Sequence, residues 1–158
     1  MKKFVASFFT LIFLVTLSHS QDTFSIVAVD ASTGEVGSAG ASCIGWPQIS
    51  IGCKIISDVH PGVGAIHTQA YYITANQNYG SELMDEGHSP QEIIDSLVTN
   101  DAQGDSSIRQ YGVVDYTGAT GFTGSGCDDY KNHIVGPNYA IQGNILLGQL
   151  LYGPGDDG

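Results

Sequence analysis

Seven polar residues stand out because they lie in segments that otherwise resemble apolar β-strands. Thr23 opens the segment "TFSIVAVD" just past a predicted cleavage point, so it is either an ordinary strand residue or a nucleophile that processing exposes. The other six carry hydroxyl or amide groups, which are costly to bury unless they form hydrogen bonds. They are Ser25, Ser42, Gln69, Gln110, Gln142 and Asn144. A structural hydrogen-bond network and a functional pocket explain this set about equally well.

Gln142 and Asn144 form the most informative pair. They are two residues apart, so on a strand their side chains share one face, and Gly143 leaves the other face open to close backbone approach. Two amides on one surface are expensive to bury, since each unsatisfied group costs about 1–3 kcal/mol. We therefore expect both side chains to point between two sheets, where they bond either to the hairpin that starts at Thr23 or to a substrate.

Metal and cofactor sites have little support in the sequence. His60, His67 and His133 have neither the helical spacing nor the zinc-knuckle spacing of metal ligands. The G-x-S-x-G, H-E-x-x-H and P-loop motifs are missing. We therefore expect no metal and no cofactor.

Residues 1–20 have the organisation of a signal peptide. Lys2 and Lys3 precede an apolar run from Phe4 to Leu17, and Ser18-His19-Ser20 fits the small-x-small rule for cleavage. The apolar run is shorter than the roughly 20 residues that a membrane span needs. We expect a protein exported to the periplasm or the extracellular space and not embedded in a membrane, with a retained anchor as the alternative.

The charge balance restricts the partners. The whole chain has a formal net charge of -11, and cleavage after residue 20 removes two lysines and no acid, which makes it -13. Only Lys54, Arg109 and Lys131 then remain as cations. Nucleic acids and anionic membranes are bound mainly by cationic patches, so we expect neither as a partner. A small-molecule or peptide substrate fits better, and a homo-oligomer stays open.

The 138 residues from 21 to 158 have the length of one domain with its own core. A hairpin is predicted from residues 24–29 and 35–44, joined by a turn that ends at Gly34, and its second arm is rich in Gly, Ala and Ser. Further β-like segments are expected at 49–56, 62–70, 108–115, 119–124 and 138–144.

Two helices are predicted between these strands. The first ends at Gly87, and the second begins with a capping box in which Ser89 is the N-cap and Glu92 follows three residues later. Its apolar residues, among them Ile93 and Leu97, form one stripe that is typical of core packing. Strands before and after a pair of helices favour a layered α+β fold over an alternating βαβ sheet.

The three cysteines allow one disulfide. If "GASCI" and "ISIGC" pair as the arms of a hairpin, Cys43 and Cys53 lie roughly opposite each other, and a bridge becomes sterically feasible in an oxidising compartment. Free thiols are the alternative. Cys127 is left unpaired or bonds between chains.

Several segments, in this order, resemble the DUF1028 family, a group of unassigned activity placed in the N-terminal-nucleophile (Ntn) hydrolase superfamily. The resemblance extends from Thr23 to Gly148. It implies a four-layer αββα sandwich, of which the C-terminal part is missing here, and it implies that Thr23 is the nucleophile. The segments are "TFSIVAVDASTGEVGSAGAS", "GVGAIHTQA", "RQYGVVD", "TGSGC" before His133, and "GPNYAIQGN".

The chemistry that this resemblance implies is the hydrolysis of an amide bond. An N-terminal Thr carries a free α-amine beside its hydroxyl, and an amine with a pKa near 7.7–8.0 can activate that hydroxyl. Ser42 and Gln69 would be pocket residues close to Thr23, and Gln142 and Asn144 would contact the substrate. A looser similarity to the catalytic β-subunits of the proteasome places Lys54 as an electrostatic helper, with an ordinary edge-strand lysine as the alternative.

Two departures from the family pattern support other readings. Gln21 and Asp22 precede Thr23, so the amine is free only if both are trimmed. The chain also ends at "GPGDDG" without the Gly-Gly-Asp-x-Arg-Gly-x-Gln-Ser-like stretch of the family. An inactive module that binds a peptide or a cell-wall fragment is therefore the second hypothesis, and a fragment without a function of its own is the third.

Overall fold

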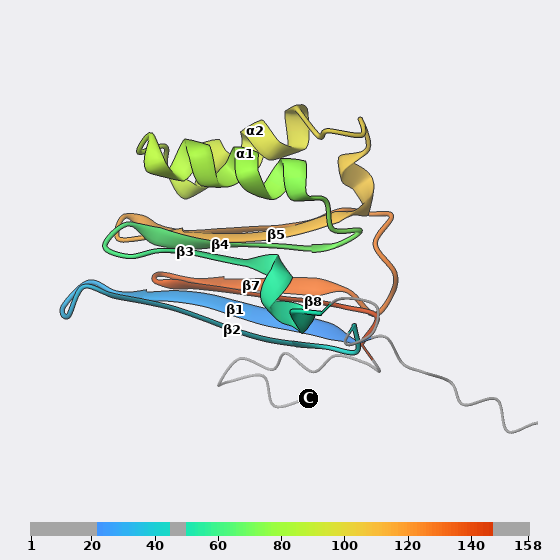
Figure 1. Cartoon of the computed structure of the whole chain (residues 1–158), viewed down its shortest axis with the longest axis horizontal. Helices are drawn as coiled ribbons and strands as arrows, with labels where there is room; N and C mark the ends of the chain where they lie inside the picture. Colours follow the sequence, from blue (N-terminus) through green and yellow to red (C-terminus); the bar gives the residue numbers. More distant parts are fainter. Residues whose placement is uncertain (1–21, 45–49, 147–158) are drawn as a thin grey trace, which may run out of the picture.

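Three layers make up the described part of the chain, which covers residues 22–44 and 50–146 of this computed structural model. Two helices pack on one four-stranded antiparallel sheet of order β3-β4-β5-β6, and the other face of this sheet packs on a second antiparallel sheet of order β2-β1-β8-β7 (Figure 1). The α+β prediction is confirmed. The predicted signal peptide and the C-terminal residues 147–158 lie outside the described residues.

The bounds of the elements follow the sequence order. The first half contains β1 (Thr23–Asp30), β2 (Glu35–Ser42), the 3-10 helix η1 (Gly52–Ile56), β3 (Ser57–His60), β4 (Gly64–Ala70) and α1 (Thr74–Asp85). The second half contains α2 (Pro90–Thr99), the 3-10 helix η2 (Ser106–Ile108), β5 (Arg109–Asp115), β6 (Gly118–Thr123), β7 (Asn132–Gly136) and β8 (Tyr139–Asn144).

The predicted hairpin and helix ends are confirmed. Gly34 takes φ +77° in the turn between β1 and β2, and Gly87 takes φ +84° after α1. The Ser89 hydroxyl accepts from the Glu92 N–H at the start of α2, and the Ser89 N–H donates to Glu92 Oε2 at 2.8 Å. Local turn and capping chemistry therefore sets these boundaries.

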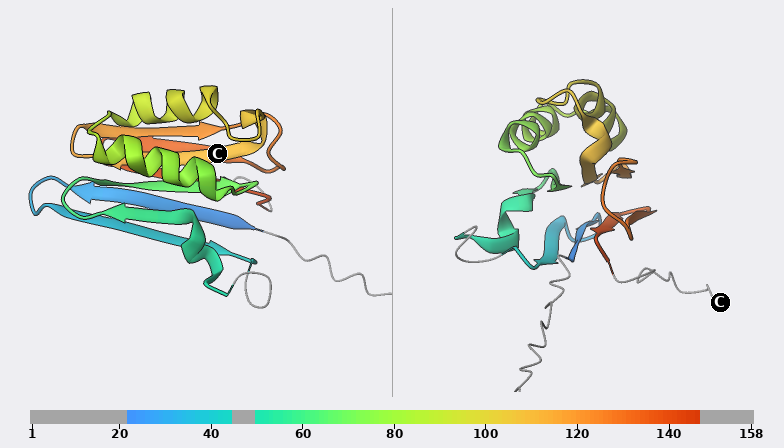
Figure 2. Two further views of the ribbon diagram at one scale, coloured as in Figure 1. Left: turned by 45° about the horizontal axis from the view of Figure 1, so that its top comes forward. Right: turned by 90° about the vertical axis from the view of Figure 1, so that its right-hand side faces the viewer.

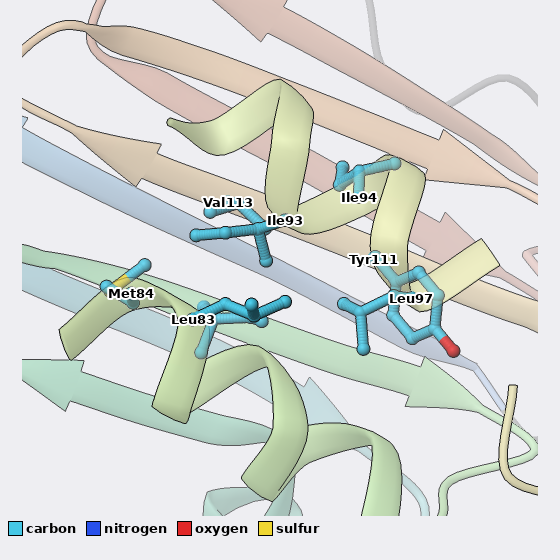
Figure 3. Packing of buried hydrophobic residues seen from close by; sticks show 8 residues of the cluster. Leu83, Met84, Ile93, Ile94, Leu97, Tyr111 and Val113 are labelled. Carbon is cyan, nitrogen blue, oxygen red and sulfur yellow. The ribbon is translucent and has the colours of Figure 1, made fainter. Parts of the chain in front are cut away.

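The helices cover only one sheet. α1 and α2 lie side by side over the sheet that contains β4 and β5, and no described helix lies on the outer face of the other sheet (Figure 2). Figure 3 shows the core beneath the helices, where the predicted α2 stripe packs on β5 and meets residues of α1. This cluster contains Ile66, Leu83, Met84, Ile93, Ile94, Leu97, Tyr111 and Val113. No described helix is long and apolar enough to span a membrane.

The predicted strand at 49–56 is wrong. Gly52 takes φ +59° and opens η1, and the extended chain begins only at Ser57. The arms expected around Cys43 and Cys53 therefore do not pair as a hairpin, and both residues are free thiols. The predicted disulfide is not formed. Strands β3 and β7 were not predicted, because each is short and its burial comes from pairing with β4 or β8.

Candidate functional site

The layer between the two sheets has an apolar half and a polar half. Inward-facing residues alternate along β1, where Thr23, Ser25, Val27 and Val29 are all buried. Val27 and Val29 join the apolar cluster of the inter-sheet layer, whereas Thr23 and Ser25 lie at the other end of the strand. Strand β8 is divided in the same way, because its polar residues Gln142 and Asn144 pair with Ser25 and Thr23 of β1. The six polar residues singled out from sequence thus collect at one end of the layer.

The direction of the hydrogen bonds in this polar half follows from two backbone carbonyls. Gln110 Nε2 lies 3.1 Å from the carbonyl oxygen of Asn132 and 2.9 Å from that of Gly143. Carbonyl oxygens can only accept, so the amide nitrogen of Gln110 faces them. Gln110 Oε1 then accepts from Gln69 Nε2 at 2.6 Å and from Asn144 Nδ2 at 3.0 Å. One buried amide on β5 therefore joins β4, β7 and β8.

The same logic extends to His67. With its nitrogen committed to Gln110, Gln69 uses its oxygen to accept from the Ser25 hydroxyl at 2.5 Å. The single Ser25 proton is then used, so Gln142 Nε2 donates to Ser25 Oγ at 2.8 Å. This nitrogen also lies 3.3 Å from His67 Nδ1, which must accept. The proton of the neutral imidazole is consequently on Nε2.

From the sequence His67 is considered only as a metal ligand, and its place in this network is missed, because a lone histidine in a strand gives no signal of its surroundings. It is fully buried, and burial lowers its pKa to about 4. Its ring is therefore neutral at pH 7. Its Nε2–H has no hydrogen-bond partner among the described residues, although it is shielded from solvent.

The buried imidazole should make stability depend on pH. The pKa of His67 is depressed from 6.5 in the unfolded chain to about 4 in the fold, so the unfolded state binds the extra proton first. The stabilisation that the neutral His67 ring contributes to the fold is fully present above about pH 6.5 and is lost as the pH falls toward 4. We expect the free energy of unfolding to decrease by about 2 kcal/mol between pH 7 and pH 5 in urea titrations. A folded His67→Gln variant should lose most of this slope, and an unchanged slope would contradict the assignment.

Gly112 makes room for the Gln142 amide. It lies on β5 opposite His67, and a Cβ atom there would come within 2.1 Å of Gln142 Oε1. We predict that Gly112→Ala destabilises the protein by about 1–3 kcal/mol, as over-packing of a core does. Gly37→Ala is the matched control, because a Cβ at Gly37 meets nothing within 4 Å. Equal melting temperatures for the two variants would show that Gln142 is not held in this position.

Thr23 lies at the open end of the polar layer. Its side chain is inward-facing between Ser42 of β2 and Asn144 of β8, and its Oγ1 lies 2.8 Å from Ser42 Oγ. A cavity of about 160 Å³ is lined by Thr23 and Asn144, and a smaller cavity of about 30 Å³ is lined by Thr23, Ser42 and Gln69. A hydroxyl nucleophile at this position would have both a hydroxyl neighbour and space for a reacting group.

Two residues with strained backbone border the larger cavity. Ala70, at the end of β4, has φ +69°, and Ile145, directly after β8, has φ +57°. They are the non-glycine residues of the described chain with positive φ, and a β-branched residue in this region is an outlier. Such strain tends to cluster at functional sites, because the surrounding structure must hold it in place.

One wall of this cavity is fixed by a buried ion pair that the sequence did not reveal. Arg109 Nη1 donates to the carbonyl oxygen of Tyr71, a residue that lines the cavity. Arg109 Nε also donates to Asp101 Oδ2 at 2.7 Å, and both side chains are almost fully buried. Hydrogen bonds from Arg109 and Asn76 hold the pKa of Asp101 well below its usual range. The pair therefore anchors the turn between β4 and α1.

The predicted site residues divide into three groups. Ser42, Gln69 and Asn144 line cavities together with Thr23, whereas Gln142 is buried within the network and contacts Ser25. The expectation that Gln142 and Asn144 point between the sheets is confirmed. Lys54 lies on η1 rather than on a strand, its side chain is exposed, and it lines a different cavity from Thr23. The alternative in which Lys54 is an edge-strand lysine is wrong, because the residue lies on η1. Its role as an electrostatic helper of Thr23 stays a prediction.

His60, His67 and His133 do not form a metal site with other described residues. His60 Nδ1 contacts Asp85 Oδ1 at 2.6 Å, and His133 Nδ1 contacts Thr123 Oγ1 at 2.9 Å. No group of three or more His, Cys, Asp or Glu side chains in the described ranges could hold a metal ion.

Comparison with known proteins identifies a matching family model and a solved structure with a similar fold. The family model described as "Family of unknown function (DUF1028)" matches residues 23–152. The crystal structure of protein SPO2555 from Silicibacter pomeroyi, assigned to the same family model, matches with a TM-score of 0.64 and 24% sequence identity. The match covers 79% of this chain and 53% of that one, so this chain spans about half the length of the solved structure. Among curated proteins, none matches.

Proposed function

The chain belongs to the family of unknown function DUF1028, and we propose that it is an exported Ntn-type hydrolase that cleaves an amide bond through Thr23. One observation carries the proposal. Thr23 begins β1 at a cavity whose walls include both strained non-glycine residues, Ala70 and Ile145. An ordinary strand-opening residue would not require this costly surrounding backbone.

The proposed reaction uses groups at this cavity. After residues 21–22 are removed, the freed α-amine of Thr23 takes the proton of its own hydroxyl while Oγ1 attacks the substrate carbonyl carbon. The tetrahedral oxyanion collapses to an ester at Thr23, and the amine of the substrate leaves with a proton. Water then hydrolyses the ester. Ser42 Oγ, at 2.8 Å, is placed to orient the Thr23 hydroxyl, and backbone N–H groups of the glycine-rich β2 are the proposed oxyanion donors.

The proposed fold in full is a four-layer αββα sandwich. The described residues supply three of these layers. Support for a fourth comes from the outer face of the β2-β1-β8-β7 sheet, where Phe24 is half exposed and forms an apolar hollow with Ile26 and Ile141. Burial of this apolar sheet face under another layer would be favourable.

The test of the function is labelling of the exported protein. We expect N-terminal sequencing and intact mass to show a chain that starts at Thr23, and a peptide epoxyketone, which reacts with both the amine and the hydroxyl of an N-terminal threonine, to add one equivalent there. Thr23→Ala should abolish the adduct, whereas Ser42→Ala should keep the reactive residue and slow the labelling. A mature chain that starts stably at Gln21 would exclude the free-amine mechanism.

A binding module without catalysis is the second candidate, and one contact favours it. The Asp22 carbonyl oxygen accepts from the Cys43 N–H at 3.2 Å, so the residue before Thr23 continues the pairing of the hairpin. Such a bond opposes trimming. A module of this kind would bind a peptide or cell-wall fragment in the same cavity and would form no Thr23 adduct with the epoxyketone.

A further inference from the structure

A further cavity, of about 340 Å³, lies where the two sheets are open at one side. Its walls come from the edge strands β2 and β3, from β4 and from η1, which stands between the two edges (Figure 1). Two of its lining residues, Cys53 and Ile56, also line the small cavity beside Thr23, but Thr23 does not line this one. The cavity therefore has its own set of polar groups.

The charged residue that lines this cavity is Lys54, and it is exposed. The described residues contain three cationic side chains of the Lys and Arg type, and two are paired: Arg109 with Asp101 at 2.7 Å, and Lys131 with Asp129 at 3.0 Å. The Lys54 ammonium forms no ion pair or hydrogen bond with any described residue. An unpaired cation is notable in a chain with sixteen acidic residues and a net charge of -11.

The second polar group is the buried His67 imidazole, which also lines the cavity. The hydrogen-bond directions place its proton on Nε2. They are traced from the Gly143 carbonyl through Gln110, Gln69, Ser25 and Gln142. That donor is fully buried and has no partner in the part of the chain described. A buried donor without an acceptor is unfavourable, so a ligand atom that accepts from it would be bound preferentially.

The remaining walls indicate the rest of the ligand. The Ser38 and Ser57 hydroxyls bond to each other at 2.6 Å across the gap between β2 and β3. Ile56 and Val59 add apolar surface. One cation and one neutral donor match a single negative charge, whereas a doubly charged group would be repelled by the acidic chain. We propose that this cavity binds a small monocarboxylate, with one carboxylate oxygen on Lys54 Nζ, the other on His67 Nε2–H, and a short apolar tail along Ile56 and Val59.

This site is separate from the proposed catalysis, because it needs neither a free amine at Thr23 nor turnover. The test uses the full chain and sodium butyrate as the probe, with chemical shifts of the His67 ring followed by NMR at constant ionic strength and at pH 7. We expect saturable binding of butyrate and a downfield shift of the His67 Hε2 proton. Butyramide, which has the same shape without the charge, should bind at least tenfold more weakly.

Two charge-matched variants decide the role of Lys54. Lys54→Met should weaken butyrate binding at least tenfold, and Lys131→Met, which removes the same charge elsewhere, should leave it within twofold of the wild type. Thr23→Ala should bind butyrate normally, which keeps this proposal distinguishable from failure of the hydrolase proposal. Absence of saturable shifts at His67, equal binding of butyramide, or equal loss in both lysine variants would overturn the site.

Discussion

Arg109→Met should lower the free energy of unfolding by about 3–5 kcal/mol, as expected when one partner of a buried ion pair is removed. The Asp101 carboxylate would keep its charge, with its side chain only 1% exposed, and would lose its two hydrogen bonds from the guanidinium. The Tyr71 carbonyl beside the Thr23 cavity would lose its donor as well. Urea unfolding at pH 7 measures the effect.

Lys131→Met is the control for this prediction. Its partner Asp129 is 81% exposed, and Lys131 Nζ also donates to the Cys127 carbonyl oxygen at 2.6 Å, so we expect Lys131→Met to cost only about 1 kcal/mol. The depressed pKa of Asp101 also makes the stability depend on pH in acid. The contribution of the Asp101 carboxylate to the free energy of unfolding is complete above about pH 4 and is lost as the pH falls below that value. The wild type should therefore lose stability more steeply than Arg109→Met below pH 4. Similar losses for both variants at pH 7 would contradict the anchoring role.

Gln110→Leu should cost on the order of 3 kcal/mol, although leucine fills a similar volume. The substitution removes the side-chain donor from the carbonyls of Asn132 and Gly143, and it removes the acceptor of Gln69 Nε2 and Asn144 Nδ2 inside the inter-sheet layer. Each such group costs about 1–3 kcal/mol, and partial relaxation keeps the total below the sum. The loss of one hydrogen bond should also weaken the other hydrogen bonds of the network, because its members polarise one another.

A double-mutant cycle with Gln142 tests whether the network is continuous. Gln110 and Gln142 do not contact each other directly but are linked through Gln69 and Ser25. We expect a coupling free energy of at least about 0.5 kcal/mol between Gln110→Leu and Gln142→Leu. Thr123→Val, at the rim of the network, should cost only about 1 kcal/mol. Additive effects, or a Gln110→Leu variant as stable as the wild type, would refute a cooperative network.

The sequence predicted the elements whose causes are local. The hairpin turn at Gly34, the helix end at Gly87 and the capping box at Ser89 depend on residues within a few positions of one another. The two-residue period also placed Gln142 and Asn144 on one inward face, because successive strand residues point to opposite sides.

The same reasoning failed where a local pattern admits two outcomes. The segment that contains Cys53 and Lys54 is apolar enough for a strand, but Gly52 adopts a left-handed conformation and the chain forms η1 instead. With this difference Lys54 lies on η1 and lines a different cavity from Thr23, and the two cysteines expected to pair are free thiols. Short apolar runs do not distinguish a strand from a helical turn by periodicity alone.

The family, the α+β class, most of the strands and the inward direction of the buried amides therefore follow from the sequence alone. Which polar groups meet depends instead on how the two sheets pack. His67 and Gln142 are 75 positions apart, and Arg109 reaches back 38 positions to the Tyr71 carbonyl. Such contacts depend on strand order and register, which are fixed by the packing of whole layers, so no local pattern encodes the proton on His67 Nε2 or the anchor beside Thr23.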